Sequence, residues 1–94
     1  MAQYKIAHIR EQGIDLIVVP LERSFGMKTV EAQRAFVETL QRAAAEANLA
    51  GTVVPVWQTG NGHAFIAPPN WHAFFKSLGW DAVLRNVNRT LSFQ

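Results

Sequence analysis

The sequence predicts an α+β domain with a small, single-layer, mainly antiparallel sheet covered by one long helix and one short helix. Three observations lead to this fold class. Residues 3–21 have the pattern of two strands joined by a Gln-Gly turn, residues 30–48 carry apolar side chains at helical spacing, and residues 52–67 have the pattern of a second hairpin. Two hairpins separated by a helix are typical of α+β domains.

Length and composition bound this prediction. Chains usually divide only beyond about 250 residues, so residues 1–94 are expected to form one domain. Hydrophobic residues make up 49% of the chain and charged residues 17%, as in folded soluble proteins. The sequence contains no cysteine, which excludes disulfides and thiolate metal sites. Neither a signal-peptide core nor a membrane span is visible in the sequence, so a cytoplasmic location is expected.

The first hairpin is predicted over residues 3–10 and 14–21. Side chains of residues 3–10 alternate between two faces, and Gln12-Gly13 offers a tight turn in which Gly13 can take a positive φ. The return strand is apolar on both faces, which favours a central position in the sheet. Pro20 lacks an N–H and is expected near the end of this strand.

The long helix is predicted over residues 30–48. Thr29 is the candidate N-cap, and the left-handed residue after the helix is either Gly51 or Asn48. The apolar face predicted to lie on the sheet consists of Val30, Phe36, Val37, Leu40, Ala44 and Ala47.

The second hairpin is predicted over residues 52–58 and 63–67, around the glycine turn 59–62. Pro55 lies inside its first strand, which argues for an edge position or a bulge. Asn70 is the candidate cap of a short helix from Trp71 to about Leu78.

The tail after Trp80 combines helical and strand spacing. Because residues 87–93 contain few good helix formers, a turn near 80–84 and a last strand to about Phe93 are favoured. The predicted order is therefore β-β-α-β-β-α-β.

The net charge of +2 is unevenly distributed. Residues 1–59 hold six basic and six acidic side chains, whereas Lys76, Arg85 and Arg89 face a single Asp81 in the remaining third. This surplus permits phosphate contacts, although it lacks the clustered excess of proteins that bind duplex nucleic acid.

One candidate anion site lies between a predicted strand and the long helix. Free backbone N–H groups at a helix N-terminus favour anions. The segment does not match a P-loop, because Met27 separates Gly26 from Lys28 and the first glycine is missing, so nucleotide hydrolysis is excluded. Two interpretations stay open: a capped surface loop, or a weak phosphate or carboxylate site formed by Arg23, Lys28 and Thr29.

The histidines His8, His63 and His72 predict no metal site, since no two of them have helical i,i+3 or i,i+4 spacing. No cofactor is expected either. Acid–base cleavage of a phosphodiester would be chemically feasible for His63 and His72 if Arg85 or Arg89 steadied the phosphate.

The segment from Trp57 to Trp80 holds all three tryptophans of the chain. Its aromatic side chains can fill the core, but three Trp and six Phe are more than one thin layer easily hides. An exposed remainder would mark a contact surface. The candidate binding residues are Trp57, His63, Trp71, His72, Lys76, Arg85 and Arg89.

The leading hypothesis is a small cytoplasmic, non-catalytic binding or self-association module, homo-oligomeric, whose partner is a protein or single-stranded nucleic acid. No membrane partner is expected. The alternative is a small metal-independent phosphodiesterase or RNase-like enzyme that uses His63, His72 and an arginine.

Overall fold

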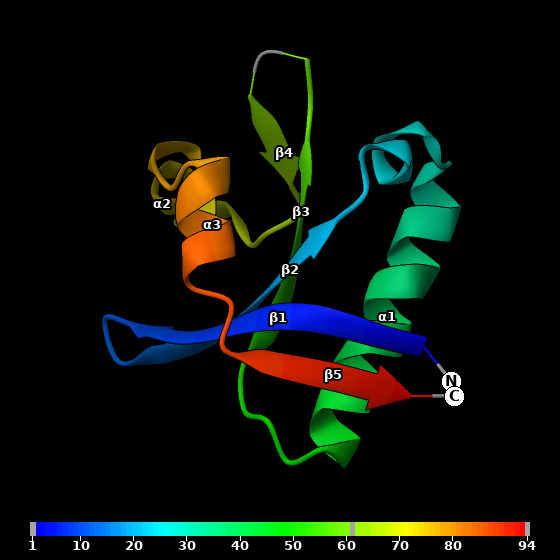
Figure 1. Ribbon diagram of the computed structural model, residues 1–94, viewed down its shortest axis with the longest axis vertical. Helices are drawn as coiled ribbons and strands as arrows, with labels where there is room; N and C mark the ends of the chain where they lie inside the picture. Colours follow the sequence, from blue (N-terminus) through cyan, green and yellow to red (C-terminus); the bar gives the residue numbers. More distant parts are fainter. Residues whose placement is uncertain (1, 61, 94) are drawn as a thin grey trace.

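The computed structural model describes the backbone of residues 2–60 and 62–93 and the side chains of all of these except Ala2 and Phe93. The fold is α+β, with a mixed five-stranded sheet and three α-helices (Figure 1). The strands are β1 Ala2–Glu11, β2 Ile14–Leu21, β3 Thr52–Gln58, β4 His63–Phe65 and β5 Arg89–Phe93. The helices are α1 Val30–Glu46, α2 His72–Ser77 and α3 Trp80–Arg85, with 3-10 turns η1 Arg23–Met27 and η2 Pro69–Trp71.

The strands lie in the order β4-β3-β2-β1-β5. Three of the neighbouring pairs are antiparallel, and β2 and β3 are parallel. The parallel pair follows from the chain order, because a helix that connects two neighbouring strands of one sheet returns the chain in the same direction. The predicted sheet was mainly antiparallel and did not include this β2-α1-β3 crossover.

The turn of the first hairpin is confirmed. Gln12 has φ 52° and Gly13 has φ 76°, the two positive values of a type I′ turn. This turn twists in the same sense as the strands it joins. β2 is central, as its two apolar faces predicted.

Both ends of α1 are closed by local hydrogen bonds. The Thr29 hydroxyl oxygen accepts from the Ala32 N–H (3.1 Å), which confirms the predicted N-cap. At the other end Asn48 has φ 61°, and the Leu49 N–H donates to the Ala44 carbonyl (2.9 Å), as in a Schellman motif. Of the two candidates for the left-handed residue that follows the helix, Asn48 is therefore correct.

The sheet is covered on both faces (Figure 1). Ile17 and Val19 of β2 belong to the core under α1, whereas Leu16 and Val18 belong to the core under α2 and α3. This alternation follows from the period of two in a strand. The two short helices therefore pack on the face opposite to α1, an arrangement that the sequence left open.

Pro55 does not mark an edge or a bulge, because β3 lies between β2 and β4. Its carbonyl accepts from the Ile66 N–H (3.1 Å), and the β3–β4 pairing ends one position away at Val56 and Phe65. The N–H that proline lacks would point to the same side as this carbonyl. A central proline is tolerated because the neighbouring strand ends there.

The C-terminal third departs most from the prediction. The helix predicted from Trp71 begins at His72 after the η2 turn, and the side chain of Asn70 does not cap it. The turn predicted near 80–84 is wrong, because this segment is helix α3. Burial of Val83, which is 1% exposed, stabilises the short helix more than its intrinsic propensity does. The last strand, β5, ends as predicted.

In the part of the chain that the structure describes, no helix combines the length and apolar character needed to cross a lipid bilayer.

Candidate functional site

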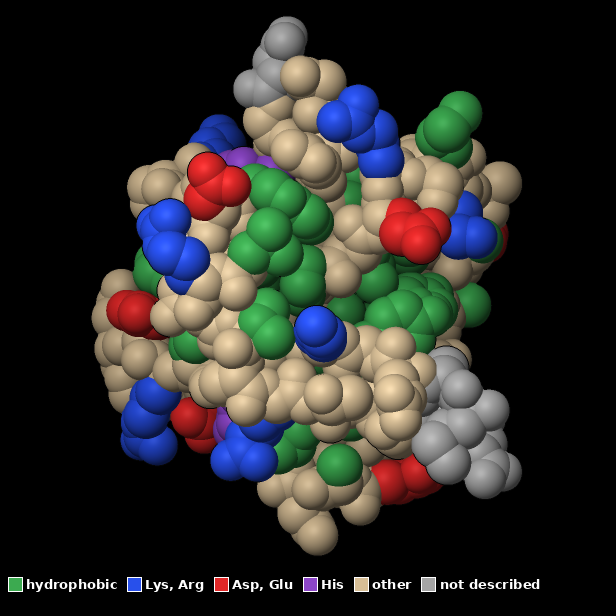
Figure 2. Space-filling view, in the orientation of Figure 1, with side chains coloured by type: hydrophobic (Ala, Val, Ile, Leu, Met, Phe, Trp, Pro, Cys, Tyr) green, Lys and Arg blue, Asp and Glu red, His purple; other side chains and the backbone are tan. Residues whose placement is uncertain are grey.

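An open cleft of about 710 Å³ lies between the β3–β4 hairpin, the start of η1 and helix α3; it is here called the hairpin cleft. Figure 2 shows hydrophobic side chains between the hairpin and α3, with acidic and basic side chains beside them. The lining consists of Arg23, Gln58, Thr59, Gly60, Gly62, His63, Ser77, Gly79, Trp80, Asp81, Ala82 and Arg85. Asn61, part of the predicted glycine turn, lies outside the described residues.

Helix α3 supplies one wall of the hairpin cleft. Gly79 has an extended backbone and starts the helix without a side-chain cap. Val83 fixes the helix to the sheet, which places Trp80, Asp81 and Arg85 along the cleft. Trp80 is half-buried, so its indole packs on the core and still offers surface to the cleft.

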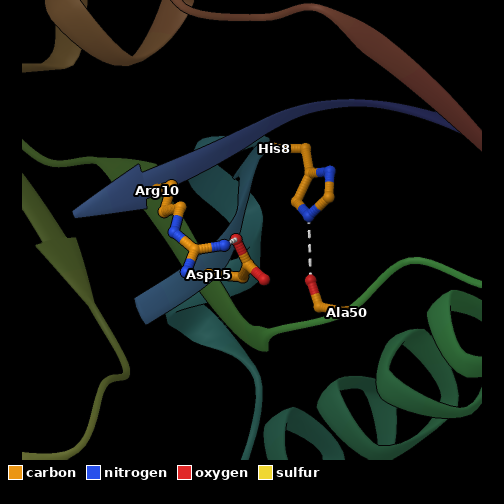
Figure 3. Close-up of polar contacts among 4 residues, drawn as sticks. All are labelled: His8, Arg10, Asp15 and Ala50. Carbon is orange, nitrogen blue, oxygen red and sulfur yellow. Dashed lines mark hydrogen bonds and ion pairs between the residues drawn. The ribbon is translucent and has the colours of Figure 1, made fainter. Parts of the chain in front are cut away.

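Two arginines from distant parts of the sequence converge on the hairpin cleft. Arg23 comes from η1 and Arg85 from the last turn of α3. Within residues 2–60 and 62–93 the one ion pair joins Arg10 and Asp15 (3.7 Å, Figure 3), so neither cleft arginine is held by a described carboxylate. A guanidinium suits planar, bidentate recognition of phosphate or carboxylate oxygens.

His63 lines the hairpin cleft and joins two elements. Its Nε2–H donates to the Phe75 carbonyl (2.6 Å), which ties β4 to α2. Its ring also lies against Phe65, with centroids 6.1 Å apart. The imidazole is therefore held in place by the fold.

His72 lies on the other side of Phe65. Its Nε2–H donates to the Ala67 carbonyl (2.9 Å), and its ring meets Phe65 edge-on at 5.5 Å. His72 is exposed and is not part of the cleft lining. The structure thus brings both histidines to one aromatic ring, but only His63 of the two to the hairpin cleft.

Trp57 and Trp71 are core residues on opposite faces of the sheet. Trp57, 9% exposed, packs edge-on against Phe25 at 5.0 Å in the core under α1. Trp71, 7% exposed, packs against Phe74 at 5.6 Å in the core under α2 and α3. Trp80 is therefore the tryptophan that offers surface for contact, whereas Trp57 and Trp71 do not.

The remaining predicted site residues are dispersed. Lys76 is exposed on α2 and Arg89 is exposed on β5 opposite Ile6, and neither lines the hairpin cleft. The three residues of the candidate anion loop also separate. Arg23 lines the hairpin cleft and Lys28 lines a second cavity, while Thr29 is engaged as the cap of α1.

His8 is a structural residue. Its Nε2–H donates to the Ala50 carbonyl (2.8 Å), which connects β1 to the loop after α1, as Figure 3 shows. The Asn88 side chain bonds both the N–H (2.9 Å) and the carbonyl (3.0 Å) of His8. Among the described residues, no three His, Asp or Glu side chains gather as metal ligands would.

The cleft is also lined by Gln58, Ser77 and Asp81, which were not predicted as site residues. One signal was present, since Asp81 and Arg85 have the i,i+4 spacing of a helix that starts after Gly79. The prediction of a turn over this segment obscured it.

Comparison of the chain with protein-family models, with curated proteins and with solved structures gives no match. What the hairpin cleft can bind is therefore judged from the side chains that line it.

Proposed function

We propose that this protein is a small cytoplasmic, non-catalytic binding module that takes a segment of single-stranded nucleic acid in the hairpin cleft. The observation that supports the proposal is the convergence of two arginines without described ion-pair partners and one half-buried indole. Arg23 and Arg85 would contact phosphate oxygens, and Trp80 would stack on a base. Proteins that bind single strands combine these two kinds of contact.

The dimensions and polarity of the cleft favour such a ligand. Its volume of about 710 Å³ lies within the range of small-ligand sites, roughly 300–1,000 Å³. It is open and largely polar, with Gln58 and Ser77 available to hydrogen-bond base edges. Protein partners usually bury an apolar or aromatic side chain in a hydrophobic pocket. Because the hairpin cleft is largely polar, a protein partner fits it less well.

The enzymatic alternative has support in one observation, that His63 shares the cleft with Arg23, Arg85 and a second titratable group, Asp81. Cleavage of RNA needs one group to take the 2′-hydroxyl proton and another to protonate the leaving oxygen. The proposed partner, His72, lies outside the lining. A binding role does not need a second acid–base group in the cleft and is therefore preferred.

The test is a fluorescence-anisotropy titration with labelled single strands of about 12 nucleotides at about 50 and 200 mM salt. Binding is expected to weaken at the higher salt, because phosphate contacts release counterions. Arg23→Gln and Arg85→Gln should each weaken binding and reduce its salt dependence. Trp80→Leu should weaken binding and leave the salt dependence unchanged, since stacking is not ionic.

Arg42→Gln, which changes an exposed residue on α1 away from the cleft, is the matched control and should bind like the wild type. Binding that ignores salt and both cleft arginines would contradict the proposal. Cleavage of an RNA strand during the titration, lost in His63→Ala, would support the enzymatic alternative instead. Native mass spectrometry on the same sample tests the expected homo-oligomer and reports any retained ligand.

A further inference from the structure

The sheet opens between β1 and β2, at the point where these two strands separate. The pairing of these strands reaches Ala7 and Val18 and goes no further, after which β1 continues along β5. In an antiparallel ladder that starts from a two-residue turn, every second pair exchanges two hydrogen bonds. The next such pair after Ala7–Val18 would join Lys5 to Pro20.

Pro20 explains why the strands part. It has no N–H to donate to the Lys5 carbonyl, so that pair cannot close. The orientation of β1 agrees, because the Ile6 carbonyl accepts from the Asn88 N–H on the β5 side, which turns the carbonyl of Lys5 toward β2. One proline in the sequence, Pro20, therefore accounts for the opening between β1 and β2.

A cavity of about 460 Å³ occupies this opening; it is here called the strand cavity. Its inner wall is apolar and comes from three elements: Leu21 at the end of β2, Phe25 in η1 and Phe36 in α1. The rings of Phe25 and Phe36 contact each other at 5.7 Å. In Figure 2 hydrophobic side chains are visible in the opening between β1 and η1, with basic and acidic side chains around them.

The rim of the strand cavity is cationic on balance. Among the lining residues that the structure describes, Lys5 and Lys28 are cationic and Glu22 alone is anionic, and all three are exposed. Neither lysine forms an ion pair with any residue that the structure describes. An apolar wall with an ammonium rim matches a ligand that has an apolar body and an anionic end.

We infer that the strand cavity is a binding site for a small organic carboxylate with an aromatic or branched aliphatic body. The body would lie against Phe36 and Leu21, and the carboxylate would reach Lys28 at the rim. This site is separate from the hairpin cleft, and the two share no lining residue in the described part of the chain. The inference therefore stands or fails independently of nucleic-acid binding.

The test is a two-dimensional NMR titration with phenylbutyrate and with phenylbutanol, its uncharged counterpart, each up to about 10 mM. Shifts are expected at the lining residues and not at the hairpin cleft. The acid should bind about five-fold tighter than the alcohol, the upper effect of one exposed ion pair. Equal affinities, or shifts spread over the whole surface, would overturn the inference.

Two variants complete the test. Lys28→Gln should lower the affinity for the acid to that for the alcohol, while Lys76→Gln, an exposed lysine on α2, should change neither. Pro20→Val restores the missing N–H and should close the opening, so that neither probe binds. Unchanged binding of both probes in Lys28→Gln and in a folded Pro20→Val would show that the probes occupy some other place and would refute the site.

Discussion

At the scale of single residues, the packing of Trp57 depends on a glycine that is itself exposed. Gly26 lies in η1 with its backbone against the indole ring. A Cβ at this position would stand 2.5 Å from Nε1 of Trp57, well inside van der Waals contact. Because the indole is rigid and sits in the core under α1, it cannot move aside as a flexible surface side chain would.

Gly26→Ala is therefore expected to destabilise the protein by about 1–3 kcal/mol, the usual effect of overpacking. Chemical denaturation followed by tryptophan fluorescence measures it. Gly60→Ala is the matched control, since a Cβ there meets no atom of the described residues within 4 Å. If both variants unfolded at the same denaturant concentration, the close approach of Gly26 to Trp57 would not limit stability.

Thr29 gives a second prediction at this scale. Thr29→Ala removes the hydroxyl that accepts from the Ala32 N–H and should cost about 1 kcal/mol of unfolding free energy. Thr39→Ala makes the same change inside α1, where the hydroxyl donates to the Ala35 carbonyl of its own helix. That control should be neutral or slightly stabilising, because Ala is the better helix former. Thermal unfolding by circular dichroism compares the two; equal losses would argue against a specific role of the cap.

At the scale of elements, the clearest prediction concerns the boundary between β1 and β2. In Pro20→Val the new amide faces the Lys5 carbonyl and should extend the ladder by one pair. Hydrogen exchange of that amide is then expected to be slow, like that of a central strand. Val56→Ala, at the residue paired with Pro20 on β3, changes no backbone donor and should leave the Lys5 region as it is. Fast exchange at position 20 would mean that something other than the proline separates the strands.

Elements that depend on local chemistry were predictable from the sequence. The positive-φ turn at Gln12-Gly13, the Thr29 cap, the start of α1 and the strand that ends at Leu21 all follow from a few neighbouring residues. Helix α3 was missed because six residues are too few to form a stable helix alone, and the segment is helical only with Val83 buried against the sheet. Tertiary packing, which a local pattern does not contain, decided that segment.

The hairpin cleft was predictable only in parts, for the same reason. Arg23 was assigned to the candidate anion site, whereas His63 and Arg85 were grouped together in the candidate binding surface and in the enzymatic alternative. The three side chains lie close together in the fold because α1 connects β2 to β3 and because α3 lies beside the β3–β4 hairpin. Two-sided burial was predicted for β2, which is buried without alternation from Leu16 to Val19, but not for β3, where Pro55 suggested an edge or a bulge.

At the scale of the whole molecule, two cores share one sheet. Neighbouring residues of β2 and β3 point into different cores, so neither face can lose its packing without loosening the strands of the other. The protein is therefore expected to unfold as one cooperative unit, although α1 and the pair α2 and α3 never pack on the same face.

Leu40→Ala and Phe75→Ala test this coupling, one in each core. Each should lower the unfolding free energy by about 2–5 kcal/mol through loss of buried apolar contacts. Fluorescence and circular dichroism should report one common transition in both variants, since Trp57 and Trp71 lie in different cores. Glu38→Ala, on the exposed side of α1, serves as the control. Separate transitions for the two signals would contradict a single unit.

The pairing of β1 with β5 determines when this fold can be completed. The first half of β1 pairs with β5 but not with β2, because Pro20 prevents the β1–β2 pairing from extending that far. The partner of Ala2 in the ladder is Phe93. Their pairing closes a loop of nearly the whole sequence, which is costly in conformational entropy. During synthesis the hairpins can form while this segment still exposes an unpaired edge, so docking of β5 is expected to be the late and slow step of folding.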